Sequence, residues 1–268
     1  AAKMGFAEKI FTLQENWLVG MSLKNFIYSN DLEDKIEVIN QIDSLAGKLT
    51  APISHLILDP NFTNAVDPLQ NIVKFLTTIK QFISHMKIFP SKVAVYAVPV
   101  HFLHLHKIRW PLKSTCEGFK HDNFDFVLEN ASNIADENVE PFSLWEYAGH
   151  ALGQPTCVFN YDVEADINKI SSVTTTKLVI DDSSKPCNGI AFWIEWKLDS
   201  SDENNDIVIS SGPKTPIKLR ELINWKFDRQ TVHLVPYRHV IQGDMKSINI
   251  AFKFSENYEK VLLDFDYH

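Results

Sequence analysis

The hydrophobic pattern of the chain changes its period near Ser91, and this change constrains the fold more than any other feature. Before it, apolar runs of strand length at 9–13 and 55–59 alternate with longer segments whose apolar residues repeat at helical spacing. After it, apolar residues recur at every second position in a series of strand-like segments. The sequence therefore predicts an α/β layer over residues 1–90 and an antiparallel sandwich or barrel over 91–268.

Two segments of the first part are predicted to be helices, residues 16–30 and residues 68–89. In the second, Pro68 suits the first turn and Pro90 lies just beyond the end. Its apolar stripe is interpreted as core and not as a cofactor site. The stripe consists of Leu69, Ile72, Val73, Leu76, Ile79 and Ile83.

Charge and cysteine content restrict the partners and the compartment. The chain has 34 acidic and 26 basic side chains, and its net charge of -8 argues against a nucleic-acid partner. No stretch approaches the roughly 20 apolar residues of a membrane span, and the N-terminus lacks the apolar run of a signal peptide. We therefore expect no membrane partner and a cytoplasmic or nuclear location. The widely spaced Cys116, Cys157 and Cys187 are expected to be free thiols.

Motifs of common active sites are missing from the sequence. It contains neither the GxSxG elbow of a hydrolase nor a glycine-rich phosphate loop after its first strand. His101, His104 and His106 lie in one strand-like segment, but strand geometry puts His101 on the face opposite to the other two. The sequence therefore predicts no metal site.

Short motifs recur along the chain in a specific order. One set consists of the serine-rich turn 210–213, the loop 225–229, the strand 230–234, the turn Gly243-Asp244 and the segment 92–110, a strand with a tryptophan-containing exit. A second set consists of 29–39, 116–119, 144–147 and 188–198. The first set resembles the barrel of the protein arginine methyltransferases, and the second resembles the second module of the tandem, two-module member of that family. Together the similar segments extend over essentially the whole chain.

The resemblance implies a fold class and a function. The fold would be a partial Rossmann-like domain of the kind that binds S-adenosyl-L-methionine (SAM), followed by a β-barrel with a helical dimerisation-type arm inserted at about 117–141. The family's first strand and glycine-rich SAM loop would precede Ala1. The parent protein would transfer methyl groups from SAM to arginine in Arg-rich proteins, and this chain would complete a ring with the N-terminal module of the same protein.

The catalytic positions that the resemblance implies fall on unsuitable residues. The acidic residue that holds the SAM ribose falls on Gln14, and the neighbouring Glu15 would point the opposite way in a strand. The two glutamates that grip the substrate guanidinium fall on Asp59 and Pro68, and proline cannot form that charge-assisted bond. The Thr-His-Trp loop falls on the lysine, phenylalanine and aspartate of 226–228.

Loss of the glycine-rich cofactor loop, the glutamate pair and the His-containing loop together predicts a structural, non-catalytic pseudo-subunit that itself binds no SAM. Two alternatives stay open. The chain is an active, divergent arginine methyltransferase, which predicts SAM binding, or it is a free-standing β-rich binding module, consistent with an aromatic content of 12%. An exposed row of aromatic side chains on one barrel face would favour the binding module.

The segment 117–141 is expected to be buried against a partner. Its apolar side chains stand among acidic residues and present more apolar surface than a free loop keeps in water. They are Phe119, Phe124, Phe126, Val127, Leu128 and Ile134.

Overall fold

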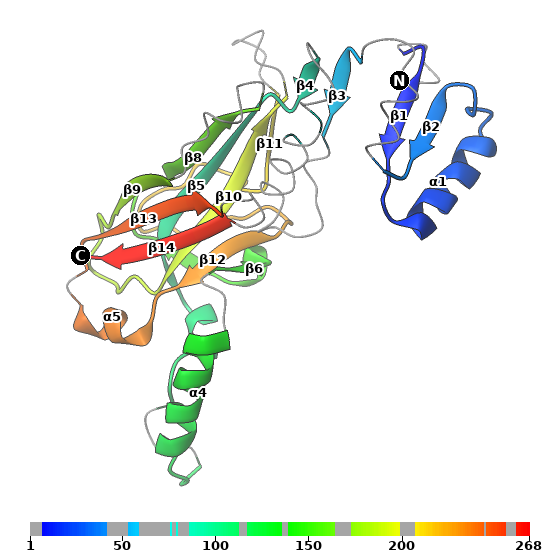
Figure 1. The fold of residues 1–268 in the computed structure, drawn as a ribbon. Coiled ribbons are helices and arrows are strands. Elements are labelled where there is room, and N and C mark those ends of the chain that lie inside the picture. Colours follow the sequence, from blue (N-terminus) through cyan, green and yellow to red (C-terminus); the bar gives the residue numbers. More distant parts are fainter. Residues whose placement is uncertain are drawn as a thin grey trace. The chain divides into compact units, whose positions relative to one another are not determined.

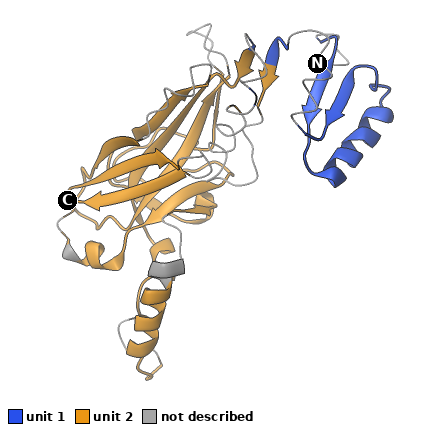
Figure 2. Cartoon of the chain, in the orientation of Figure 1, with its two compact units in different colours: residues 1–55, 77–86 blue, residues 56–76, 87–268 orange. Residues whose placement is uncertain are grey.

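The computed structural model describes eleven stretches of the chain. They are residues 7–41, 53–58, 76, 79, 86–112, 117–135, 139–163, 173–198, 207–243, 245–255 and 261–268. The chain divides into two compact units, one of residues 1–55 and 77–86 and one of residues 56–76 and 87–268 (Figure 2). The domain boundary near residue 90 stays a prediction.

A β-α-β element makes up most of the described part of the first unit. Strand β1 (Ile10–Leu13) and strand β2 (Ile36–Ile39) pair in parallel, and helix α1 (Trp17–Tyr28) connects them (Figure 1). The side-chain oxygen of Asn16 accepts hydrogen bonds from the first free backbone N–H groups of α1, which explains where the helix begins. The parallel α/β layer and the helix within 16–30 are confirmed here.

The second predicted helix is right in part. Leu76 and Ile79 are helical and buried, as expected of the apolar stripe, and its other members lie outside the described residues. The predicted end of the helix is wrong, because β4 (Lys87–Phe89) is a strand paired with β3 (His55–Ile57), so Pro90 follows a strand. A segment as short as three residues fits the apolar period of a helix and that of a strand. Only the strand with which it pairs decides between the two structures.

The second unit carries the antiparallel strands. They form one sheet in the order β6-β12-β10-β5-β7, with β11 beside β10 and β8 beside β5, and a second sheet in the order β14-β13-β9 (Figure 1). The bounds are β5 (Lys92–Phe102), β6 (Glu140–Phe142), β7 (Gly149–Ala151), β8 (Thr156–Asp162), β9 (Val173–Val179), β10 (Gly189–Lys197), β11 (Val208–Ser210), β12 (Gln230–Leu234), β13 (Ser247–Phe254) and β14 (Val261–Tyr267).

These strands confirm the antiparallel domain but do not close into a barrel within the described residues. Instead, side chains of the two sheets pack against each other: the ring of Phe159 on β8 stacks on Phe252 of β13 with centroids 4.6 Å apart, and Phe192 on β10 meets Phe265 of β14. An alternating sequence specifies which face of a strand is buried, but it does not specify whether the last strand meets the first.

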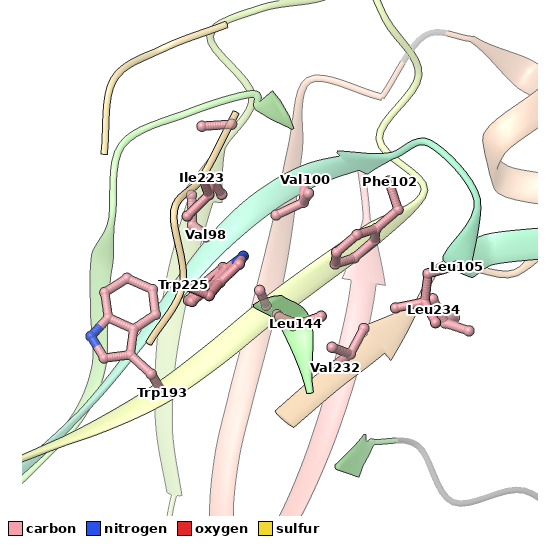
Figure 3. Packing of buried hydrophobic residues seen from close by; sticks show 12 residues of the cluster. Val98, Val100, Phe102, Leu105, Leu144, Trp193, Ile223, Trp225, Val232 and Leu234 are labelled. Atoms are coloured by element: carbon pink, nitrogen blue, oxygen red, sulfur yellow. The ribbon is translucent and has the colours of Figure 1, made fainter. Parts of the chain in front are cut away.

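A cluster of buried apolar side chains lies on the long sheet. Figure 3 shows its side chains, which come mainly from β5, β10 and β12. Phe102 at the end of β5 is fully buried there, and two glycines of neighbouring strands leave room for its ring: a Cβ on Gly189 would lie 2.6 Å from the ring and one on Gly149 3.0 Å from it. Large and small residues are thus matched across neighbouring strands.

The inserted arm is a helix, as predicted within 117–141. Helix α4 (Asp122–Ala135) lies between the 3₁₀ helix η1 (Leu105–Ile108) and β6. The remaining short elements are η2 (Leu144–Glu146) and α5 (Tyr237–Gln242).

Thiol reactivity should follow burial. Cys157 and Cys187 are free, and burial raises the pKa of both thiols, that of Cys187 to about 12. We expect Cys187 to resist a thiol reagent in the native chain at about pH 8, and all three cysteines to react after denaturation without reductant. The number of reacted thiols per chain, measured from the absorbance of the released chromophore, checks this. Recovery of a single thiol after denaturation would reveal a disulfide.

Candidate functional site

The residue at the ribose position of the family is used in a local turn. Gln14 follows β1 directly, and its backbone N–H donates to the carbonyl of Ile39 over 2.8 Å. Its side-chain oxygen accepts from the backbone N–H of Asn16 at 3.2 Å, and Glu15 beside it is exposed. These described residues do not offer the buried carboxylate that would hold a ribose hydroxyl.

The guanidinium-clamp positions lie outside the described residues. Asp59 and Pro68 both belong to a stretch without described placement, so the degenerate clamp stays a prediction.

The loop that aligns with the family's Thr-His-Trp loop is built from structural contacts. Trp225 is buried and meets Trp193 edge to face, with ring centroids 5.9 Å apart, as expected of a packing residue. The Lys226 ammonium donates to the carbonyl of Ser210 at 2.9 Å, and the Asp228 carboxylate accepts from the backbone N–H of Arg229 at 2.8 Å. The loop therefore supplies no imidazole, and its lysine and aspartate form hydrogen bonds with backbone groups.

Phe227 of the same loop is exposed. Its ring contacts Trp145 edge to face at 5.2 Å, and the Lys214 ammonium lies 3.6 Å from its centroid. This arrangement is a surface cation–π contact and holds no titratable group of the kind that methyl transfer needs.

Gln230, which follows this loop, has a role that sequence reasoning missed. It is buried at the start of β12, where its amide nitrogen donates to the carbonyl of Ser211 at 2.7 Å and its amide oxygen accepts from the backbone N–H of Leu144 at 3.1 Å. Gln230 thus joins the serine-rich turn to η2. The available signal was an amide side chain at the start of a strand-like segment, since an amide that becomes buried requires hydrogen-bond partners.

The histidine segment is not a continuous strand, which corrects one expectation. Strand β5 ends at Phe102, His104 precedes η1 and His106 lies within it. His101 Nδ1 lies 2.8 Å from the carbonyl oxygen of Pro186, and His106 Nδ1 lies 3.0 Å from the Asn188 amide. Among the described residues no group of three potential metal ligands is found, so the absence of a metal site stays a prediction.

Two helices carry exposed large apolar side chains. On α4, Phe126 is 68% exposed, and Phe124, Val127 and Leu128 are exposed with it. On α1, Trp17 is also 68% exposed. Sequence reasoning anticipated the surface on α4, whose Ile134 side chain lies outside the described residues, but missed the one on α1. That surface comprises Trp17, Leu18, Val19, Met21, Phe26 and Tyr28.

Within the described residues, no helix has the length and apolar character needed to cross a membrane.

Comparison with known proteins gives a consistent family. No protein-family model matches the chain. Protein arginine N-methyltransferase 7 of Aedes aegypti is 31% identical over 271 residues, covering 97% of this chain and 39% of that protein. The Drosophila willistoni protein of the same name is 32% identical over 92% of this chain and 35% of its own length, and that of Drosophila erecta is 35% identical over 79% and 30%. The chain thus spans between 30% and 39% of these three relatives.

Solved structures show the same fold at low identity. The Trypanosoma brucei PRMT1 enzyme-prozyme heterotetrameric complex with AdoHcy matches with a TM-score of 0.62 and 12% identity, covering 98% of this chain and 78% of that one. PRMT6 matches with 0.59 and 9% over 98% and 85%, and Arabidopsis thaliana protein arginine methyltransferase 10 with 0.60 and 12% over 99% and 79%. The chain shares the fold of these structures, and by its sequence similarity to the relatives above it belongs to the protein arginine N-methyltransferase family.

Proposed function

We propose that this chain is the second module of a protein arginine methyltransferase and serves as a structural, non-catalytic pseudo-subunit. The N-terminal module of the same protein would transfer methyl groups from SAM to arginine in Arg-rich proteins. The observation that carries the proposal is the loop around Lys226 and Asp228, in which the side chains aligned with the family's catalytic loop hold backbone instead.

The ribose position supports the same proposal. A SAM ribose would need an acceptor at Gln14, but the side-chain oxygen there already accepts from the turn at Asn16, and the side chain carries no charge. The described residues at this position therefore do not fit the cofactor.

The two exposed apolar surfaces support a pseudo-subunit. A ring of two modules needs a docking surface on the arm and another on the α/β part, and α4 and α1 each carry exposed large apolar residues. One solved structure with this fold is an enzyme-prozyme complex. We propose that the N-terminal module of the same protein covers both surfaces.

A free-standing β-rich binding module is less well supported. The aromatic side chains of the long sheet, such as Phe102, Phe192 and Trp193, are buried. The exposed Trp145 and Phe227 lie in η2 and in a loop, and form a pair and not a row along a sheet.

Isothermal titration of the purified chain with SAM tests the proposal against an active methyltransferase. We expect no binding heat up to about millimolar SAM, because the described cofactor position lacks its charged partner. A parallel titration of an active arginine methyltransferase verifies the assay. A micromolar Kd for this chain would overturn the proposal and support the divergent enzyme.

A further inference from the structure

The arm joins the rest of the second unit through two short segments, residues 105–112 and 139–142, which are called the root below. The chain enters and leaves the arm side by side, because the Arg109 guanidinium and the Glu140 carboxylate form an ion pair of 2.6 Å. The backbone N–H of Leu112 donates to the Asp125 carboxylate in the first turn of α4 at 3.0 Å. The placement of α4 therefore depends on how this root is held.

A row of three rings in edge-to-face contact holds the root against the rest of the unit. The imidazole of His106, only 6% exposed, meets the indole of Trp110 edge to face with centroids 4.1 Å apart. Trp110 in turn meets Tyr237 at the start of α5, at 4.9 Å. Trp110 thus lies between η1 and α5, with His106 on one side of it and Tyr237 on the other.

Hydrogen bonds assign the protonation state of His106. Asn188 is fully buried, and its amide oxygen accepts from the backbone N–H of Phe102 at 2.7 Å. Its amide nitrogen consequently donates, to the carbonyl of Phe102 at 2.9 Å and to His106 Nδ1 at 3.0 Å. A ring nitrogen that accepts a hydrogen bond from an amide N–H uses its lone pair and carries no hydrogen itself. His106 is therefore neutral, with its hydrogen on Nε2.

We propose that His106 and Trp110 form a latch at the arm root, which holds α4 in place while His106 is neutral and releases it when His106 is protonated. A proton on Nδ1 would face the donor N–H of Asn188, so the bond is lost, and the new charge is buried. The imidazole must then leave its position, and Trp110 loses its edge-to-face contact with His106.

The groups around the ring favour the neutral form. Burial lowers the pKa of His106 below its ordinary value of 6.5, and three neighbours act in the same direction: His101 on β5, Lys107 on η1 and His104 just before η1. The backbone carbonyl of Phe102 opposes them. On the α5 side, Trp110 separates the imidazole from Tyr237.

The direction of the pH dependence follows. Above pH 6.5 His106 is neutral in both the folded and the unfolded chain, so the latch is fully closed. Below that value the open and unfolded states bind the proton more readily than the closed state, so the latch weakens as the pH falls. That this alters docking of the arm on a partner module rests on the proposed function, whereas the latch itself does not.

Hydrogen exchange of the isolated chain tests the latch. We expect the protection of the peptide covering 105–112, corrected for intrinsic exchange, to fall about threefold or more between about pH 7.5 and about pH 5.5. His106→Gln should remove this dependence, because glutamine can accept from Asn188 and does not titrate. The matched control is His104→Gln, an exposed residue next to η1, which should keep the dependence.

Three results would overturn the latch: protection that is equal at both pH values, pH dependence retained in His106→Gln, or pH dependence lost in His104→Gln. If His106→Gln fails to fold, the indole N–H resonance of Trp110, assigned with Trp110→Phe, replaces it as the readout. That resonance should shift with a midpoint below pH 6.5, and a resonance that does not move refutes the proposal. Neither measurement depends on SAM or on activity, so the proposed function and the latch fail separately.

Discussion

Replacing Phe102 with alanine should lower the free energy of unfolding by about 3–5 kcal/mol. The ring is 0% exposed at the end of β5, and two neighbouring strands carry glycine where a Cβ would touch it. Gly149 and Gly189 have no side chains that could move into the space, so the variant would retain a cavity in the centre of the cluster shown in Figure 3.

Urea unfolding monitored by circular dichroism measures this change. Phe227→Ala is the matched control, because it removes the same atoms from a ring that is 76% exposed, and it should change the stability by no more than about 0.5 kcal/mol. A loss below about 1 kcal/mol for Phe102→Ala would contradict the packing described for this cluster.

The second large effect is expected from the arm. Phe124→Asp combined with Phe126→Asp, introduced into the proposed two-module protein, should impair the methyltransferase activity proposed for it, although neither residue belongs to a catalytic position. Burying a phenylalanine contributes about 1.5–3 kcal/mol, so losing two at the proposed contact between modules removes several kcal/mol. In this chain alone both side chains are exposed, and the same double variant should leave its thermal stability nearly unchanged.

A charge-matched control separates lost apolar contact from added negative charge. Asn123→Asp with Asn130→Asp adds two carboxylates to exposed positions of the same helix and removes no apolar surface. We expect activity and melting temperature of the complete protein to fall only in the phenylalanine variant. If both quantities match those of the unmodified protein, α4 does not dock on the N-terminal module.

Local pattern determined much of the fold. The alternation of apolar residues predicted the antiparallel strands after Ser91. Helical spacing predicted α1, and the alternation of helices with strands predicted that α1 belongs to a parallel α/β layer. The resemblance to the family predicted an inserted helical arm at about 117–141, and the helix is observed as α4. The strands and α1 follow from sequence because the period of the apolar residues must match the geometry of the backbone that buries them.

The sequence by itself also determined the family, since the order and spacing of short segments matched it where no single motif was specific. Tertiary structure alone decided the strand at β4, the open pair of sheets, the exposed surface of α1, the two hydrogen bonds of Gln230 and the partners of His106. Each of these depends on residues distant in the chain. Asn188 and His106 are 82 positions apart, yet their contact decides which imidazole nitrogen carries the proton. A periodic pattern records which face of an element avoids water, whereas the partner on that face is chosen only when the elements pack.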